Sequence, residues 1–162
     1  MKLGILSDTH DRLPTFRRAV QLFQRLKVDA IFHAGDYVAP FAVRLIAADV
    51  LADTPLYCIY GNNDGERQGL KKVLPNLQDG PLRVELAGKT LVMHHYRDWL
   101  GASDLRGADV VISGHDHTAN IETVNDTLYL NPGECCGWVN DRPTCATLDL
   151  DTMHAQIIEV HE

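Results

Sequence analysis

Short motifs rich in Asp, His and Asn follow five separate predicted strands, and this recurrence constrains the fold more than any other feature. The motifs are Asp8-Thr9-His10, Gly35-Asp36, Gly61-Asn62, His94-His95 and Gly114-His115-Asp116-His117. In open sheets with parallel strands, ligands bind in the crevice beyond the carboxyl ends of the strands. We therefore expect these five strand ends to converge on one site.

The first half of the chain alternates short apolar runs with stretches of helical periodicity. Apolar runs at 2–7, 29–33 and 56–60 predict buried strands, and the segments 13–26 and 39–51 predict the helices between them. The second helix is apolar almost all round, so we expect it to be buried. Alternating strands and helices are typical of a parallel sheet with crossover helices.

The second half predicts mainly hairpins. Its expected elements are a helix at 68–74, a strand at 110–113, and three hairpins that pair 82–86 with 90–94, 120–124 with 127–130, and 145–150 with 155–160. A length of 162 residues is typical of one domain. The sequence therefore predicts a single α/β domain over residues 1–162, with two sheets packed face to face and helices outside.

Composition narrows the possible partners. The net charge of -7 disfavours a broad nucleic-acid surface, since phosphate contacts need clustered Lys and Arg. No apolar run reaches the roughly 20 residues of a membrane span. The apolar stretch at the start is too short for a signal peptide, so we expect a cytoplasmic protein. The four cysteines form no CxxC pair and are expected to be reduced, partly buried thiols: Cys58, Cys135, Cys136 and Cys145.

The side chains at the strand ends are of the types that bind metal ions. Asp8 and His10 are two residues apart, as are His115 and His117, so each pair would face one side of an extended chain. The full set of candidate ligands is Asp8, His10, Asp36, Asn62, His94, His115 and His117. Imidazole, carboxylate and amide groups together suit Mn, Fe, Co, Ni or Zn better than Ca. Seven ligands are too many for one tetrahedral ion but fit two ions that share a carboxylate, a recurring device in phosphoryl chemistry.

The ordered motifs resemble those of the calcineurin-like metallophosphoesterases, over residues 3 to about 150. The segment Asn131-Pro132-Gly133-Glu134 is similar to that of the compact bacterial and archaeal phosphodiesterase branch. The resemblance implies a four-layer αββα sandwich and hydrolysis by in-line attack of a metal-bridging hydroxide on phosphorus. It also implies a ligand division, with Asp8, His10, Asp36 and His117 at the first metal, Asp36 bridging, and Asn62, His94 and His115 at the second.

Two positions depart from the family pattern. Many members have His where this chain has Asn63, and that His is thought to protonate the leaving group. Many members also have Gly where this chain has His95, which is a candidate to replace the missing acid. The resemblance therefore makes Asn62, Asn63 and His95 the candidate catalytic residues. Arg12 and Arg97 neighbour the ligand loops and are candidates to bind substrate phosphate, with solvated surface charges as the alternative.

Two other polar residues leave alternatives open. His33 either orients a metal ligand or is a core histidine. Asp64 either hydrogen-bonds near the metals or only completes an Asn-Asp-Gly turn.

The favoured function is a phosphodiesterase for small or nucleotide-like diesters, with two divalent ions, manganese foremost. The alternatives are a phosphomonoesterase, a nuclease, or a non-catalytic scaffold resembling the retromer subunit of the same fold. We expect no membrane partner, no nucleic-acid partner, and a possible homo-oligomer.

Overall fold

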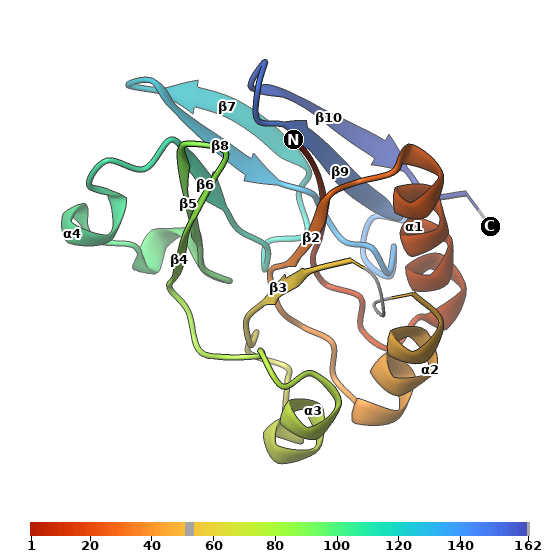
Figure 1. Cartoon of the computed structure of the whole chain (residues 1–162). Coiled ribbons are helices and arrows are strands. Elements are labelled where there is room, and N and C mark those ends of the chain that lie inside the picture. The colour runs from red at the N-terminus through yellow and green to blue at the C-terminus, as the bar shows by residue number, and fades with distance from the viewer. Residues whose placement is uncertain (51–53, 162) are drawn as a thin grey trace.

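Three parallel strands form the centre of the first sheet in the computed structural model, which describes residues 1–50 and 54–161 (Figure 1). The strand order is β10-β9-β1-β2-β3, in which β1 to β3 run parallel and β9 is antiparallel to both β1 and β10. The strands are β1 (Lys2–Leu6), β2 (Ala30–His33), β3 (Leu56–Cys58), β9 (Thr144–Asp149) and β10 (His154–Glu159). This arrangement confirms the predicted parallel sheet and the last hairpin.

The second sheet also has three parallel strands. Its order is β4-β5-β6-β8-β7, with β5, β6 and β8 parallel and the edge strands β4 and β7 antiparallel to their neighbours. The strands are β4 (Leu82–Leu86), β5 (Lys89–Met93), β6 (Val110–Ile112), β7 (Asn120–Val124) and β8 (Thr127–Asn131). Both remaining predicted hairpins, β4–β5 and β7–β8, are confirmed.

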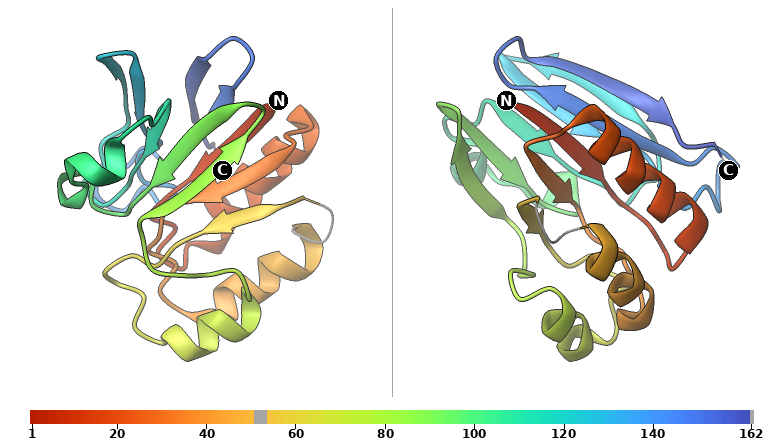
Figure 2. Two further views of the ribbon diagram at one scale, coloured as in Figure 1. Left: turned by 60° about the vertical axis from the view of Figure 1, so that its left-hand side comes forward. Right: turned by 45° about the vertical axis from the view of Figure 1, so that its right-hand side comes forward.

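The helices lie outside the two sheets, as Figures 1 and 2 show. They are α1 (Leu13–Leu26), α2 (Pro40–Val50), α3 (Arg67–Val73), a 3-10 turn η1 (Arg97–Trp99) and α4 (Ala102–Leu105). Helix α1 has a proline near its first turn and buries Phe16, Val20 and Phe23 at helical spacing. Gly4 of β1 makes room for this helix, since a Cβ there would collide with the Phe23 ring.

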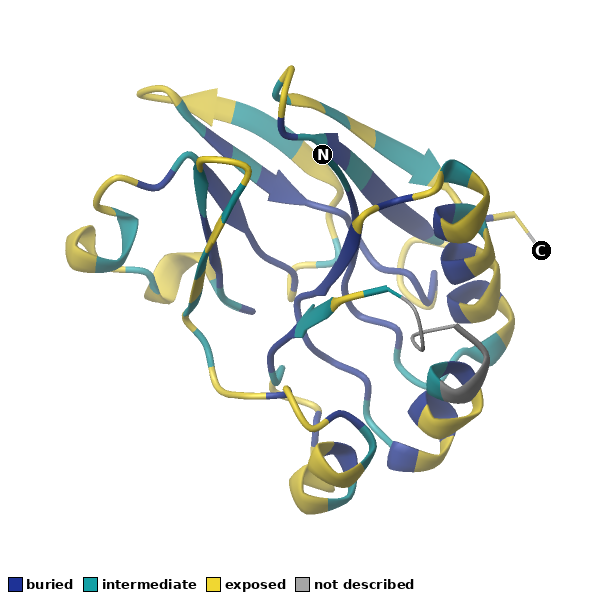
Figure 3. Cartoon of the chain, in the orientation of Figure 1, coloured by how far each residue is buried: buried dark blue, intermediate teal, exposed yellow. Residues whose placement is uncertain are grey.

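Alternating side chains build the core on both faces of β1. Leu3 and Ile5 pack in one cluster with residues of the second sheet, such as Met93 and Ile112. Leu6 packs on the opposite face with the residues of α1. A smaller cluster lies between the second sheet and the segment around α4. The buried strands between half-exposed helices in Figure 3 therefore form the four-layer αββα sandwich that was expected.

One expectation about burial is wrong. Helix α2 exposes Phe41 by 59% and Leu45 by 48%, although Ala42, Val43 and Ile46 are buried. An apolar composition all round the helix did not reveal that only one side packs against the sheet. The predicted end at Leu51 lies outside the described residues. No described helix combines the length and apolar character needed to cross a membrane.

Candidate metal centre

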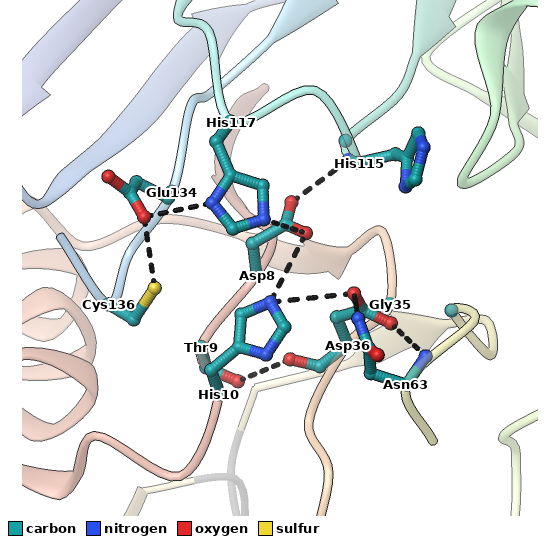
Figure 4. A network of polar contacts seen from close by, with 12 residues as sticks. Asp8, Thr9, His10, Gly35, Asp36, Asn63, His115, His117, Glu134 and Cys136 are labelled. Atoms are coloured by element: carbon teal, nitrogen blue, oxygen red, sulfur yellow. Dashed lines mark hydrogen bonds and ion pairs between the residues drawn. The ribbon is translucent and has the colours of Figure 1, made fainter. Parts of the chain in front are cut away.

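The loops that follow β1, β2 and β6 bring four predicted ligands into one cluster (Figure 4). The Asp8 Oδ1 atom lies 3.4 Å from His117 Nε2 and 3.7 Å from His10 Nε2. The His10 Nε2 atom lies 3.4 Å from Asp36 Oδ2. All four side chains that the family resemblance assigns to the first metal are therefore neighbours.

A second set of groups adjoins the first through Asp36. Ligand atoms of Asp8, Asp36 and His95 all lie within 4.8 Å of one another. The His95 Nε2 atom is 3.5 Å from Asp36 Oδ2 and 2.9 Å from Asn62 Oδ1. His115 Nδ1 lies 3.0 Å from the same Asn62 oxygen. Asp8 and Asp36 are buried, whereas Asn62 and His115 are exposed, so the cluster opens to solvent on the Asn62 side.

Backbone geometry at these positions differs from the extended chain assumed from the spacing. Left-handed φ angles occur at Asp8 (53°), His10 (39°), Asp36 (62°), His115 (73°) and His117 (61°). The extended-chain argument is therefore wrong, because each paired motif coils tightly instead. Such conformations cost about 1–3 kcal/mol each and cluster at functional sites.

Two glycines give the carboxylates their room. A Cβ on Gly61 would collide with the Asp36 carboxylate, and a Cβ on Gly114 would collide with Ser7 and approach Asp8 Oδ2 to 2.7 Å. Glycine at both positions therefore lets the backbone approach these side chains closely.

Two histidines have one ring nitrogen fixed and the other directed into the cluster. His95 Nδ1 lies 2.7 Å from the Ala34 carbonyl oxygen, and His117 Nδ1 lies 2.9 Å from Glu134 Oε2. Both partners only accept hydrogen bonds, so each Nδ1 carries the proton and donates it. With the proton held on Nδ1, the Nε2 atom is the nitrogen left to bind a metal ion, the arrangement typical of metal-binding histidine.

The donor set fits divalent metal ions. Asp8 Oδ1 and His10 Nε2 are buried without a hydrogen-bond partner, although Asp36 and His117 lie close by. Acceptor atoms of carboxylate, imidazole and amide thus face one another, an arrangement that either a proton or a bound cation would satisfy. Mixed nitrogen and oxygen ligands suit first-row transition metals.

Proton affinities in the cluster show the same accumulation of negative charge. The Asp8 carboxylate raises the pKa of His10 above its usual value. Burial lowers the pKa of His95, but the Asp36 and Asp8 carboxylates outweigh burial and raise it overall. For the Asp36 carboxyl, burial raises the pKa. The hydrogen bond and charge of His95 and two hydrogen bonds from Asn63 outweigh burial and hold this pKa well below its usual range. A proton on histidine stands in for the cation that these carboxylates attract.

Two predicted residues occupy other environments. His94 Nδ1 accepts a hydrogen bond from the Tyr96 amide at 3.0 Å, and its ring lies beside Trp99 with centroids 5.8 Å apart. The structure therefore brings His95, rather than the predicted His94, to Asp36. Asn63 donates to both Asp36 oxygens, from its amide nitrogen at 2.8 Å and its side chain at 2.7 Å. These two hydrogen bonds from Asn63 fix the orientation of the Asp36 carboxylate.

The two candidate arginines have different surroundings. Arg97 pairs with Glu122 and lies over the Tyr129 ring at 4.2 Å. Arg12 donates to the Cys136 carbonyl oxygen at 2.6 Å and lies over the Trp138 ring at 4.6 Å. Arg12 thus adjoins the His10 loop, whereas Arg97 is directed to the β7–β8 hairpin.

Glu134 is a buried residue beside the cluster that was not among the predicted site residues. Besides His117, it accepts hydrogen bonds from the Val139 amide at 3.0 Å and the Cys136 thiol at 3.2 Å. Cys136 lies within 4.8 Å of the His10 and His117 ligand atoms, but burial raises its pKa to about 12, so it stays a protonated thiol. Glu134 follows β8, which is the sixth parallel strand of the two sheets. Its position after a parallel strand could have indicated that it lies near the other candidate residues.

Asp64 and His33 accept hydrogen bonds from backbone amides of the loops that follow β2 and β3. The Asp64 carboxylate accepts hydrogen bonds from four backbone amides, those of Asp36, Tyr37, Val38 and Gly61, at 2.7–3.1 Å. His33 accepts from the Gly35 amide at 3.2 Å, and burial lowers its pKa to about 3. The neutral ring therefore orders the loop that carries Asp36.

Two face-to-face sheets with Asp, His and Asn gathered at their parallel strand ends define a metallophosphoesterase architecture. The model of the calcineurin-like phosphoesterase superfamily domain matches residues 1–153. The chain belongs to this superfamily.

Relatives and solved structures agree with that assignment. The chain is 40% identical over 162 aligned residues to phosphodiesterase MJ0936 of Methanocaldococcus jannaschii, covering 93% of this chain and 94% of the relative. A structure characterised as a novel archaeal phosphodiesterase has a TM-score of 0.85 and 34% identity, over 98% of this chain and 99% of that one. Vacuolar Protein Sorting 29 from Cryptosporidium parvum shares the fold alone, with a TM-score of 0.65 and 14% identity over 98% and 95% of the two chains.

Proposed function

We propose that the protein is a phosphodiesterase that hydrolyses small or nucleotide-like phosphodiesters with two divalent metal ions. The observation that carries the proposal is the central place of Asp36. Its Oδ2 atom lies 3.4 Å from His10 Nε2 and 3.5 Å from His95 Nε2, which supports a carboxylate shared by two ions. The relatives characterised as phosphodiesterases support the choice of a diester.

Each ion would have its own ligands besides the shared Asp36. Asp8, His10 and His117 would hold the first ion, and Asn62, His95 and His115 the second. His95 takes the place predicted for His94. Two such ions would polarise the phosphate and lower the pKa of a bound water.

The chain's own groups hold this arrangement in place. Ala34 and Glu134 fix the ring orientations of His95 and His117 through their Nδ1 protons. Asn63 restrains Asp36 and has no titratable proton to give to a leaving group. We therefore expect good leaving groups, such as aryl oxides, to be released fastest.

Three finer predictions belong to the same proposal. Manganese stays the expected metal, as one of the first-row transition metals that a mixed nitrogen and oxygen ligand set suits. The four free, buried thiols among the described residues agree with a reducing, cytoplasmic location. A single domain over residues 1–162 and a homo-oligomeric state stay predictions.

Hydrolysis assays with metal-stripped protein test the proposal. Bis-p-nitrophenyl phosphate and p-nitrophenyl phosphate are compared with and without Mn²⁺, beside an Asp36→Asn variant. We expect diester hydrolysis that requires metal and is lost in the variant. Faster monoester hydrolysis would make the protein a phosphomonoesterase. No turnover with Mn²⁺, Ni²⁺ or Zn²⁺ would overturn the enzymatic proposal in favour of the scaffold.

A further inference from the structure

A row of aromatic rings leads outward from the metal-binding side chains. The Tyr96 ring lies 4.1 Å from the His115 ring and meets the His95 ring edge-on at 5.2 Å. Trp99 stacks on Tyr96 with ring centroids 4.4 Å apart and an interplanar angle of 15°. We call Tyr96 and Trp99 the aromatic ledge.

The outer ring of the ledge is largely uncovered. Trp99 is 71% exposed, the highest value among the exposed large hydrophobic residues described. Tyr96 covers one face of the indole, and His94 is tilted by 42° against it with centroids 5.8 Å apart. A large exposed indole beside a candidate active site gains little for the fold and offers a flat apolar surface to a ligand.

Hydrogen bonds and an ion pair fix the backbone turn that carries the aromatic ledge. The Trp99 amide donates to the Tyr96 carbonyl oxygen at 3.3 Å within η1, and the Tyr96 amide donates to His94 Nδ1. Arg97 lies between Tyr96 and Trp99 in the sequence. Its guanidinium pairs with Glu122 and lies over the Tyr129 ring. Both aromatic rings therefore stand on an anchored turn, which lowers the entropic cost of ordering them on a ligand.

The other exposed tryptophan is arranged differently. Trp138 has the Arg12 guanidinium over its ring, and its indole nitrogen donates to the His10 carbonyl oxygen at 3.3 Å. Each tryptophan therefore has one ring face covered, Trp138 by a guanidinium and Trp99 by the Tyr96 ring. Trp99 is the tryptophan that continues the row of rings from His115.

We propose that the aromatic ledge binds the nucleobase, or another planar aromatic group, of the diester by stacking on Trp99. This inference rests on the proposed phosphodiesterase function and names its substrate class. A phosphate bound at the metal-binding side chains would lie beside His115. The Tyr96 ring contacts the His115 ring, and the Trp99 ring stacks on Tyr96 farther out. Stacking on an aromatic ring tolerates any base, since every base has a flat π face.

Fluorescence tests the ledge without turnover, because the chain has two tryptophans. In the Zn²⁺-loaded Trp138→Phe variant, Trp99 is the emitting indole. We expect adenosine 5′-monophosphate to quench this emission and ribose 5-phosphate to leave it unchanged. The Trp99→Phe variant, in which Trp138 emits, should show no quenching. Equal quenching in both variants, or none in either, would overturn the proposal.

Kinetics give a second test with a constant leaving group. Thymidine 5′-(p-nitrophenyl phosphate) and methyl p-nitrophenyl phosphate are compared as ratios of kcat/KM. Trp99→Ala should lower the preference for the nucleoside diester about tenfold, while Phe41→Ala, at the exposed aromatic of α2, should not change it. An unchanged preference in Trp99→Ala, with both diesters cleaved, would overturn the ledge and leave the phosphodiesterase intact. If the wild type cleaves neither diester, the proposed function fails and quenching alone decides the ledge.

Discussion

His94 and His95 are adjacent in the chain and have opposite environments. The His95 side chain is 2% exposed and directed at Asp36 and Asn62, whereas His94 is half-buried and lies beside Trp99. The pair offers a matched test, since the same substitution at either position removes the same imidazole.

We predict that His95→Ala weakens binding of the second metal ion, because the ring supplies an unprotonated Nε2 to the shared centre. The loss should exceed the roughly 10–100-fold typical of changes to groups behind the ligands. His94→Ala should keep two ions per chain. Metal content by elemental analysis and titration calorimetry measures both, and loss of an ion only in His94→Ala would restore His94 as the ligand.

Asn63→His tests the missing acid. The new imidazole would supply a titratable proton where the resemblance places the family's acid, and the Asn63 backbone hydrogen bond to Asp36 would remain. We expect turnover of an alkyl phosphodiester to rise at least about tenfold, below the 10²–10⁴-fold of a fully positioned acid. An aryl diester, whose leaving group needs no proton, should gain little. Equal effects on both diesters would contradict this role.

Residue order predicted the cluster, but not that His95 rather than His94 lies beside Asp36. Asp8, His10, Asp36 and His117 follow strands, so chain order was enough to predict that they converge. The choice between His94 and His95 depends on how the chain turns after Met93, which spacing does not encode. Glu134 acts through its contact with His117, which lies far from it in the sequence.

At the level of elements, one carboxylate joins two loops. Asp64 follows β3 and accepts hydrogen bonds from three consecutive amides of the loop after β2, beginning at Asp36. It also closes its own turn at Gly61. The turn explanation and the metal-site explanation of this residue are therefore both part of its role.

We predict that Asp64→Asn lowers the free energy of unfolding by about 2 kcal/mol or more, since an amide group cannot accept on both ends and a buried N–H left unpaired costs about 1–3 kcal/mol. Asp79→Asn is the control, because Asp79 forms an exposed pair with Arg67 and such pairs contribute about 0–1 kcal/mol. Urea unfolding of metal-stripped protein measures both. Equal losses in the two variants would argue against the role of Asp64.

Glu134→Gln tests the segment after β8. A glutamine can still accept from His117 Nδ1 but loses the negative charge that keeps the ring oriented and basic. We expect metal affinity to fall about 10–100-fold with the fold intact. Titration calorimetry and thermal unfolding separate these effects, and unchanged affinity would show that His117 needs no carboxylate behind it.

Elements with a clear periodicity or a buried apolar run could be predicted, and the shortest helical turns could not. Helix α1 and the β4–β5 hairpin carry clear 3.6-residue or turn signals. The η1 turn and α4 span only three and four residues, too few for a periodic pattern. The exposure of Phe41 depends on which side of α2 packs on α1 and the sheet, which is decided by tertiary contacts.

For the whole molecule, carboxylate charge at the centre predicts a pH dependence. The pKa values of His10 and His95 are raised from 6.5 in the metal-free protein, so both bind protons more tightly when folded. Their contribution to stability is therefore full below the unfolded pKa and is lost as pH rises through the folded values. Metal ions compete for the same nitrogens and gain affinity as those protons leave.

We therefore expect the Tm difference between Mn²⁺-loaded and metal-stripped protein to widen between about pH 6 and pH 8. Thermal unfolding of the two forms across this range measures it. A difference that stays constant with pH would contradict the proton–metal competition.

The candidate metal ligands extend from Asp8 to His117, which has a consequence for biosynthesis. Asp8 lies near the start, His117 follows β6, and its partner Glu134 follows β8, while β1 itself pairs with β9 from Lys2 to Ile5. A nascent chain must therefore be made past Asp149 before the first strand has both its neighbours. We expect loading with metal to follow translation, so that a ribosome-bound chain arrested before β6 captures no ion at this centre.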